Sequence, residues 1–96
     1  MLLQIGRRRA LSTGADSLIA RYIEENPHKP GPADARLKDA GTAVWALVSH
    51  LDRAVGGDVA QVALDYQVPV EAVQTARAYY KRHRKLIDAR IALNAA

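Results

Sequence analysis

Side chains suited to contact with DNA gather in the C-terminal half of the chain. Gln74 can pair bidentately with adenine, and Thr75 can reach a phosphate or the methyl group of thymine. Basic side chains that can bind phosphate follow directly, and their binding should weaken steeply with salt. They are Arg77, Lys81 and Arg82.

A second basic run lies near the N-terminus, where Arg7, Arg8 and Arg9 follow one another. Such a run can act as an arm on phosphates or in a minor groove. Carboxylates oppose DNA binding: Glu71 can accept from cytosine but repels phosphate, and Asp58 and Asp65 add to that repulsion. The sequence therefore predicts phosphate contact more clearly than it predicts base recognition.

Catalytic chemistry is not indicated. No two of His28, His50 and His83 have metal-ligand spacing, and the serines have no neighbouring motif that would activate them. The glycines form no phosphate-cradling loop, and the chain has no cysteine. His50 and Asp52 are interpreted as a surface pair, and Trp45 as an edge residue of the core. We expect neither enzyme activity nor a cofactor.

Helices are expected to position the DNA-contacting residues. A helix beginning after Thr42 as N-cap carries an apolar stripe and ends at Gly56-Gly57. The residues of the stripe are Val44, Leu47, Val48, Leu51 and Val55. Asp58 is expected to cap the next helix, whose stripe is Val59, Val62, Ala63 and Tyr66.

The turn Gln67-Val68-Pro69 must end this second helix, because Val68 precedes a proline. The small Ala63, the turn residue Gln67 and the apolar Val73 have the spacing of a helix-turn-helix, although glycine is more usual at Gln67. The exposed residues near the start of the third helix would be Val70, Glu71, Gln74, Thr75 and Ala78.

The third helix is predicted to continue unbroken from Val70 to Leu93, since no glycine or proline interrupts it. Such a helix is too long to pack entirely on two short ones. Its second half should bury apolar residues against a second copy, a partner or the folded-back N-terminal segment. They are Leu86, Ile87, Ile91 and Leu93.

The first 40 residues are harder to interpret. Residues 1–17 are expected to be a flexible basic arm. Leu18 to Glu25 fits a helix or a short strand, and its β-branched content before Asn26-Pro27 slightly favours the strand. A proline-rich loop follows, and Ala35 to Thr42 contains a second short strand or a turn. Any such strands are expected to pair with a second copy or a partner.

Composition and charge limit the remaining possibilities. Ninety-six residues make one small, mainly α domain, divided into an arm at 1–17, a strand-and-loop segment at 18–40 and a helical part at 41–96. The net charge is +4, with basic ends around an acidic middle, which is typical of nucleic-acid or acidic-protein binding. The missing cysteines and the lack of a secretory signal or long apolar run favour the cytoplasm.

From Gly41 onward the sequence resembles the bacterial domain-of-unknown-function family 433. The resemblance rests on "GTAVWALVSHL" and "GGDVAQVALDYQVPVEAVQTARAYYKRHRKLID". Its matching positions are Gly41, Thr42, Val44, Trp45, Gly57, Asp58, Val62, Tyr66, Val73, Ala76, Tyr79, Tyr80 and His83. The segment "HKPGPADARLKDAGT" departs from the short strand that usually precedes the Gly-Thr pair in that family.

The resemblance implies an antitoxin similar to the VapB type, which would cover a PIN-like ribonuclease toxin and, as a homodimer, bind the operator DNA of its own operon. An arginine from the third helix could then enter the carboxylate-and-metal centre of the toxin. The residues expected at the toxin are Arg84, Lys85, Ile87, Arg90 and Ile91. The alternative is a protein–protein adaptor whose helix-turn-helix does not bind DNA.

Overall fold

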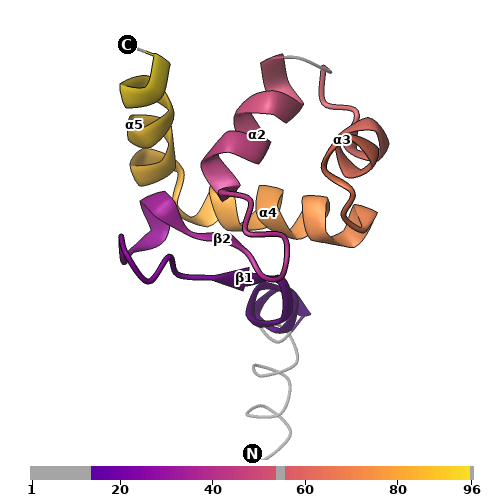
Figure 1. The fold of residues 1–96 in the computed structure, drawn as a ribbon, viewed down its shortest axis with the longest axis horizontal. Coiled ribbons are helices and arrows are strands. Elements are labelled where there is room, and N and C mark those ends of the chain that lie inside the picture. Colours follow the sequence, from indigo (N-terminus) through magenta and orange to yellow (C-terminus); the bar gives the residue numbers. More distant parts are fainter. Residues whose placement is uncertain (1–13, 54–55, 96) are drawn as a thin grey trace, which may run out of the picture.

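The computed structural model describes residues 14–53 and 56–95, and these are mainly helical with one small antiparallel sheet (Figure 1). A helix at residues 14–22 comes first and leads into a strand. The elements after it are β1 Ile23–Glu24, the short 3-10 helix η1 Pro32–Asp34, β2 Arg36–Leu37, α2 Val44–Arg53, α3 Val59–Tyr66, α4 Val70–Arg82 and α5 Arg84–Ala95. Within the described ranges no helix has both the length and the apolar character needed to cross a membrane.

Helices α2, α3 and α4 pack on one another through the apolar stripes expected of them. Val44, Leu47, Val48 and Leu51 of α2 are buried, as are Val62 and Ala63 of α3. Val55 lies outside the described residues. Helix α2 begins at Val44, so the residue before it is Ala43, and the prediction of Thr42 as N-cap is wrong. The carbonyl of Thr42 instead accepts from the Leu37 N–H, which ties this residue to β2.

The connection between α3 and α4 has the predicted geometry. The Asp58 side chain accepts from the Gln61 N–H at 3.0 Å and caps α3. Gln67 follows α3 in the left-handed conformation, with φ of 57°, and its N–H bonds back to the carbonyls of Ala63 and Leu64. Val73 is buried in the crossing with Ala63. The turn therefore brings the start of α4 close beneath α3.

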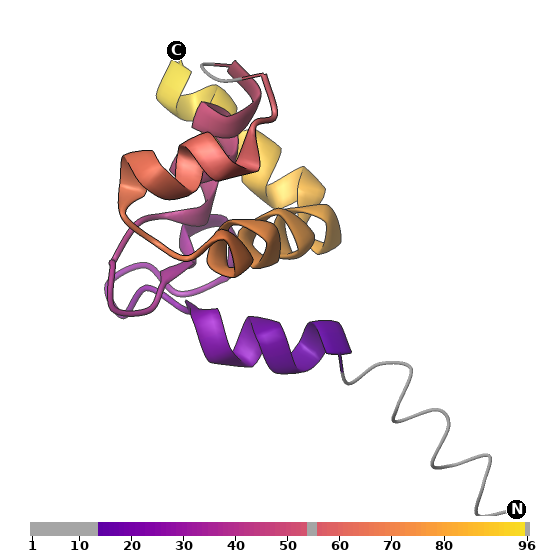
Figure 2. The same cartoon turned by 90° about the vertical axis from the view of Figure 1, so that its right-hand side faces the viewer.

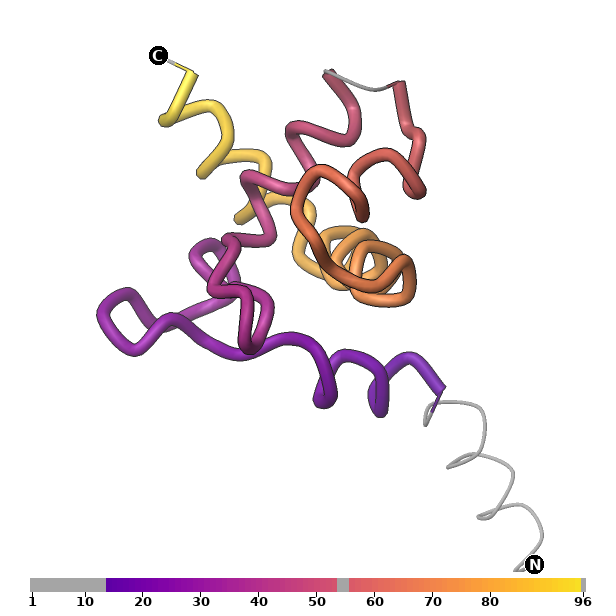
Figure 3. The backbone as a smooth tube through the Cα atoms, turned by 45° about the vertical axis from the view of Figure 1, so that its right-hand side comes forward, coloured from indigo at the N-terminus to yellow at the C-terminus, as the bar shows by residue number. Residues whose placement is uncertain are grey.

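The predicted unbroken third helix is wrong, because the chain bends at His83 and continues as α5. Figure 3 shows the tube turning away between the two helices. The bend carries Ile87 onto η1 and α2, where its side chain is fully buried. The free energy gained by burying this side chain accounts for the break, although the sequence has no glycine or proline there. Leu86 and Leu93 are exposed, so of the apolar residues expected to be covered here only Ile87 is buried and Ile91 partly so.

The N-terminal region also differs from the expectations. Residues 14–22 are helical, so the slightly favoured strand at 18–25 is reduced to Ile23–Glu24, and the arm expected at 1–17 is already helical from Gly14. Leu18, Ile19 and Tyr22 share the inner face of this helix, and all three are partly buried. The helical spacing of these apolar residues outweighs their β-branched content. Arg7, Arg8 and Arg9 lie outside the described residues.

The two short strands pair with each other rather than with a second copy or partner. Ile23 lies opposite Leu37 and Glu24 opposite Arg36, and the Arg36 guanidinium donates to Glu24 at 2.8 Å. Ile23, Ala35 and Leu37 join the same buried cluster as the helices. The strand-and-loop segment and the helical part therefore share one hydrophobic core.

Candidate nucleic-acid interface

One strip of α4 faces solvent. Val70, Gln74, Arg77 and Lys81 recur at the i, i+4, i+7 and i+11 positions, which share one side of a helix, and all four are exposed. The opposite side of α4 holds the buried residues Ala72, Val73 and Ala76. Gln74, Arg77 and Lys81, three of the residues predicted to contact DNA, therefore lie together on the open side of α4.

Thr75 does not belong to this strip. Its side chain is only 3% exposed, and its hydroxyl donates to the Glu71 carbonyl at 2.7 Å. The prediction that Thr75 is exposed is wrong, because the N-terminal helix covers this part of α4. A buried hydroxyl that already has a backbone partner offers nothing to a phosphate or a base.

The helix at residues 14–22 packs across α4: Figure 1 shows this helix nearly end-on below α4, and Figure 2 shows it from the side. At one end the Tyr22 hydroxyl donates to Glu71 at 2.8 Å, and at the other the Arg82 guanidinium donates to Asp16 at 2.7 Å. The bond to Glu71 is the main cause that raises the pKa of Tyr22. Between these two bonds Ala15 and Leu18 line a hollow together with residues of α4, which are Glu71, Gln74, Thr75 and Ala78.

Because of this arrangement, Arg82 is not free to bind phosphate. The residue was expected to be free for phosphate, but its charge is paired with Asp16, and both side chains are about half exposed. Neither this pair nor the contact between Tyr22 and Glu71 was anticipated from the sequence. The helical spacing of Leu18, Ile19 and Tyr22 was the signal that could have revealed them.

Beyond the strip, the basic surface continues across the bend into α5. Arg77, Lys81 and Arg84 line a shallow hollow whose floor includes Val48 and Leu51 of α2. Among residues 14–53 and 56–95 no ion pair involves Arg77, Lys81, Arg84 or Lys85. Their charges are therefore not neutralised by a carboxylate in direct contact, although Asp52 lies at the edge of the same hollow.

The Arg84 guanidinium lies over the ring of Tyr80, 5.4 Å from its centroid. The hydroxyl of Tyr80 donates to Asp88 at 2.7 Å, and this bond is the main reason that the pKa of Tyr80 is raised. The two contacts join the end of α4 to the first turns of α5. Tyr79 and Tyr80 are both partly buried.

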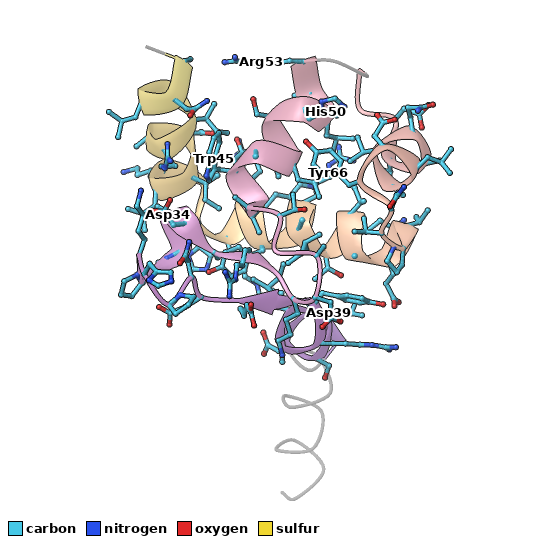
Figure 4. All side chains as sticks on the ribbon, in the orientation of Figure 1. Asp34, Asp39, Trp45, His50, Arg53 and Tyr66 are labelled. Atoms are coloured by element: carbon cyan, nitrogen blue, oxygen red, sulfur yellow. The ribbon has the colours of Figure 1, made fainter. Side chains whose placement is uncertain are left out.

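The five residues expected to bind a toxin do not form one surface. Ile87 is fully buried, so it cannot contact a partner without unfolding of this region. Arg90 is held inside the molecule: its Nε donates to Asp34 at 3.0 Å, and its guanidinium lies 4.4 Å from the centroid of the Trp45 ring. Figure 4 shows Trp45 and Asp34 on the side of the molecule next to α5. Of the five, Arg84 and Lys85 are exposed, while Ile91 is partly covered.

The contacts of Trp45 confirm its interpretation as an edge residue of the core, since it packs against the buried cluster and under Arg90. Arg90 therefore fastens α5 to η1 and α2. The expectation that Arg90 enters a partner as a free cation is wrong for this conformation, because its charge is paired with Asp34 and its guanidinium plane packs on Trp45.

A polar cluster joins α2 to α3 on another side of the molecule. His50 contacts Asp65 at 3.2 Å, rather than the neighbouring Asp52 expected from the sequence, and its ring meets Tyr66 edge-on (Figure 4). Hydrogen bonds from Gln61 and, after it, from His50 lower the pKa of Asp65. Within the described part of the chain no group of three His, Asp or Glu side chains is placed to hold a metal ion.

Comparison of this chain with models of protein families, with curated proteins and with solved structures gives no match. The similarity to the domain-of-unknown-function family 433 therefore stays an expectation from the motifs quoted above. The features of this chain that bear on its function are its fold and the charged surface of α4 and α5.

Proposed function

We propose that this chain is a DNA-binding regulator of the helix-turn-helix type, with α3 and α4 as the motif. The observation that supports the proposal is the exposed strip of α4, where Gln74, Arg77 and Lys81 lie side by side. The strip leads into Arg84 and Lys85, and none of the four cations takes part in an ion pair within the described residues.

In this proposal the side chains divide into two tasks. Arg77, Lys81, Arg84 and Lys85 bind phosphates, which supplies affinity and fixes the orientation of the protein on the duplex. Gln74 is the side chain of the strip that can distinguish bases, by donating to N7 and accepting from N6 of adenine. Thr75 and Arg82 are left out, because one is buried and the other is paired with Asp16.

The regulator would act in the cytoplasm, and as a homodimer it would present two copies of α4 to successive turns of an operator. The resemblance to the domain-of-unknown-function family 433 adds a PIN-like toxin to the proposal as a second partner. With Ile87 buried and Arg90 engaged, the cations left to reach the acidic centre of such a toxin are Arg84 and Lys85. Capture of protein and DNA on the tagged chain in its host tests this part.

The DNA-binding proposal is tested by titrating a labelled duplex with the full chain at several salt concentrations. The combined change Arg77→Ala and Lys81→Ala should weaken binding and reduce the slope of log K against log salt by about 2, since two phosphate contacts are lost. Gln74→Ala should reduce the preference between duplex sequences and leave the slope unchanged.

The matched control is Arg53→Ala, which removes an exposed positive charge at the end of α2, away from the strip (Figure 4). If this change lowered the slope as much per charge as the changes in α4, binding would depend on net charge alone. The proposed interface would then be rejected.

The alternative is a protein–protein adaptor without DNA recognition. The observation that favours it is an exposed apolar patch over α3 and the turn, where Leu64 is 72% and Val70 is 44% exposed. Ala60 and Val68 complete the patch. The adaptor predicts that DNA affinity shows no sequence preference and that Leu64→Lys abolishes capture of the protein partner. The DNA-binding proposal predicts that Leu64→Lys does not weaken duplex binding, because the added charge attracts phosphate.

A further inference from the structure

We propose that the helix at residues 14–22 is a detachable cover on α4, and that α4 enters the major groove only after this helix has moved away. The inference rests on the proposed function, because it concerns the regulation of the same DNA-binding surface. It starts from the two contacts that join the helix to α4 at Glu71 and Arg82.

The width of the major groove limits which helices can enter it. The major groove is about 12 Å wide and admits a single helix. A helix with its side chains is about 10–12 Å across, and packed helices lie about 8–10 Å apart, so a side-by-side pair spans about 20 Å. Because residues 14–22 pack across one side of α4 while α2 and α3 pack on it elsewhere, the groove would have to hold two helices where they cross, and it has room for one (Figures 1 and 2).

The helix at residues 14–22 is only weakly attached to α4. None of its nine described residues is buried: Leu18, Ile19 and Tyr22 are partly exposed, and the other six are exposed. Its ion pair with α4, Asp16 to Arg82, joins two side chains that are 54% and 45% exposed. Exposed pairs of this kind contribute little and weaken with salt.

The contacts also indicate which end moves. The end near Tyr22 is tied to the turn after β2, because the Lys38 ammonium donates to the Ala20 carbonyl at 2.6 Å and the Lys38 N–H donates to the Tyr22 carbonyl at 2.8 Å. Ile23 follows directly in the core. Among residues 14–53 and 56–95, the ion pair that joins the end near Gly14 to α4 is the exposed one between Asp16 and Arg82. The helix should therefore swing from its N-terminal end, with the hinge at Tyr22 and Ile23.

Opening changes the charge of the DNA-binding surface in the favourable direction. In the docked state Asp16 places a carboxylate beside Arg82, and phosphate must compete with it. In the open state Arg82 joins Arg77 and Lys81 as a free cation, and Thr75 and Ala78 lose their cover. DNA, by pairing with Arg82, would itself favour the open state.

The decisive experiment locks the cover in place. The chain has no cysteine, so the full-length double variant Ala15→Cys and Ala78→Cys carries two unique thiols on opposite sides of the same hollow. One sample is joined with a short bismaleimide, and the control sample of the same protein has both thiols capped separately. We expect the joined protein to bind a labelled duplex at least tenfold more weakly than the capped protein.

A milder variant tests the same idea without a cross-link. Asp16→Asn should raise the affinity for duplex several-fold, whereas Asp39→Asn, which removes the same charge from the turn after β2, should raise it less. Hydrogen exchange of the wild type gives a third measurement: adding duplex should accelerate exchange of the amides at residues 14–22, because a nine-residue helix is marginal once undocked.

The outcomes separate the two proposals. If joining the thiols leaves affinity unchanged while binding still depends on Arg77 and Lys81, the cover is rejected and the DNA interface stands. Equal effects of Asp16→Asn and Asp39→Asn, or slower exchange at residues 14–22 on adding duplex, would also reject the cover. If the capped protein and the wild type bind duplex no better than the Arg77→Ala and Lys81→Ala variant, the proposed function fails and the cover fails with it.

Discussion

At the scale of single residues, Arg90 shows how one side chain can serve two contacts. Its Nε donates to Asp34, and the same guanidinium lies over Trp45, so one residue joins α5 to η1 and to α2. The side chains of Arg90 and Asp34 are 24% and 21% exposed, which protects the pair from much of the solvent screening that weakens surface pairs. Arg90 is therefore a structural residue in this conformation.

Arg90→Met keeps most of the aliphatic stem and removes the charge. We expect it to lower the free energy of unfolding by about 1 kcal/mol, because one partly buried ion pair and one cation–π contact are lost. Urea unfolding followed by the fluorescence of Trp45, the single tryptophan, measures both stability and the environment of the ring. Lys85→Met is the control, and an equal loss in both variants would show that α5 responds to charge in general.

At the scale of elements, the turn between α3 and α4 carries a residue in a strained conformation. Gln67 has φ of 57°, in the left-handed region that glycine adopts more easily. The backbone needs this conformation because the Gln67 N–H must turn back to the carbonyls of Ala63 and Leu64. Its side chain is exposed, so it gives little packing in return.

Gln67→Gly should therefore stabilise the protein by about 0.5–1 kcal/mol. The change relieves the strain at this residue, but glycine also makes the unfolded chain more flexible, and this offsets part of the gain. Thermal or urea unfolding followed by circular dichroism measures the change. Gln67→Ala retains the Cβ atom and should give no such gain. A gain with alanine equal to that with glycine would assign the effect to the removed side chain and not to the backbone.

At the scale of the whole molecule, the two-stranded sheet and helices α2 to α5 share one core. Ile23 and Leu37 from the sheet, Leu47 from α2, Val73 from α4 and Ile87 from α5 belong to a single buried cluster. Since α5 covers η1 and α2, it closes the core over segments that are distant in the sequence (Figure 1). We infer that the sheet and helices α2 to α5 unfold together in one transition.

Ile87→Ala tests this coupling. Removing a fully buried isoleucine should cost about 2–5 kcal/mol, a large part of the 5–15 kcal/mol that a small domain possesses. Leu86→Ala, at the neighbouring residue that is 52% exposed, should cost far less. Within each variant, far-ultraviolet circular dichroism and Trp45 fluorescence should report the same urea midpoint. Separate midpoints would show that α5 unfolds independently.

The sequence by itself determined the helices of the central motif and most of their buried faces. The stripes in α2 and α3, the Asp58 cap and the stop before Pro69 are local effects of side-chain spacing and backbone chemistry, so they are visible in one segment at a time. The same holds for the exposed positions of Gln74, Arg77 and Lys81, which follow from the phase of α4.

Only the tertiary structure decided which charged and polar side chains remain free. Thr75, Arg82 and Arg90 looked available in the sequence. In the structure Thr75 lies beneath the helix at residues 14–22. Arg82 is paired with Asp16, and Arg90 is paired with Asp34. The break at His83 was hidden for the same reason, because it depends on a site for Ile87 that η1 and α2 create together. The periodicity of a segment can indicate that one of its faces is covered, as it does for Leu18, Ile19 and Tyr22, but which distant segment covers that face becomes visible only when the chain is folded.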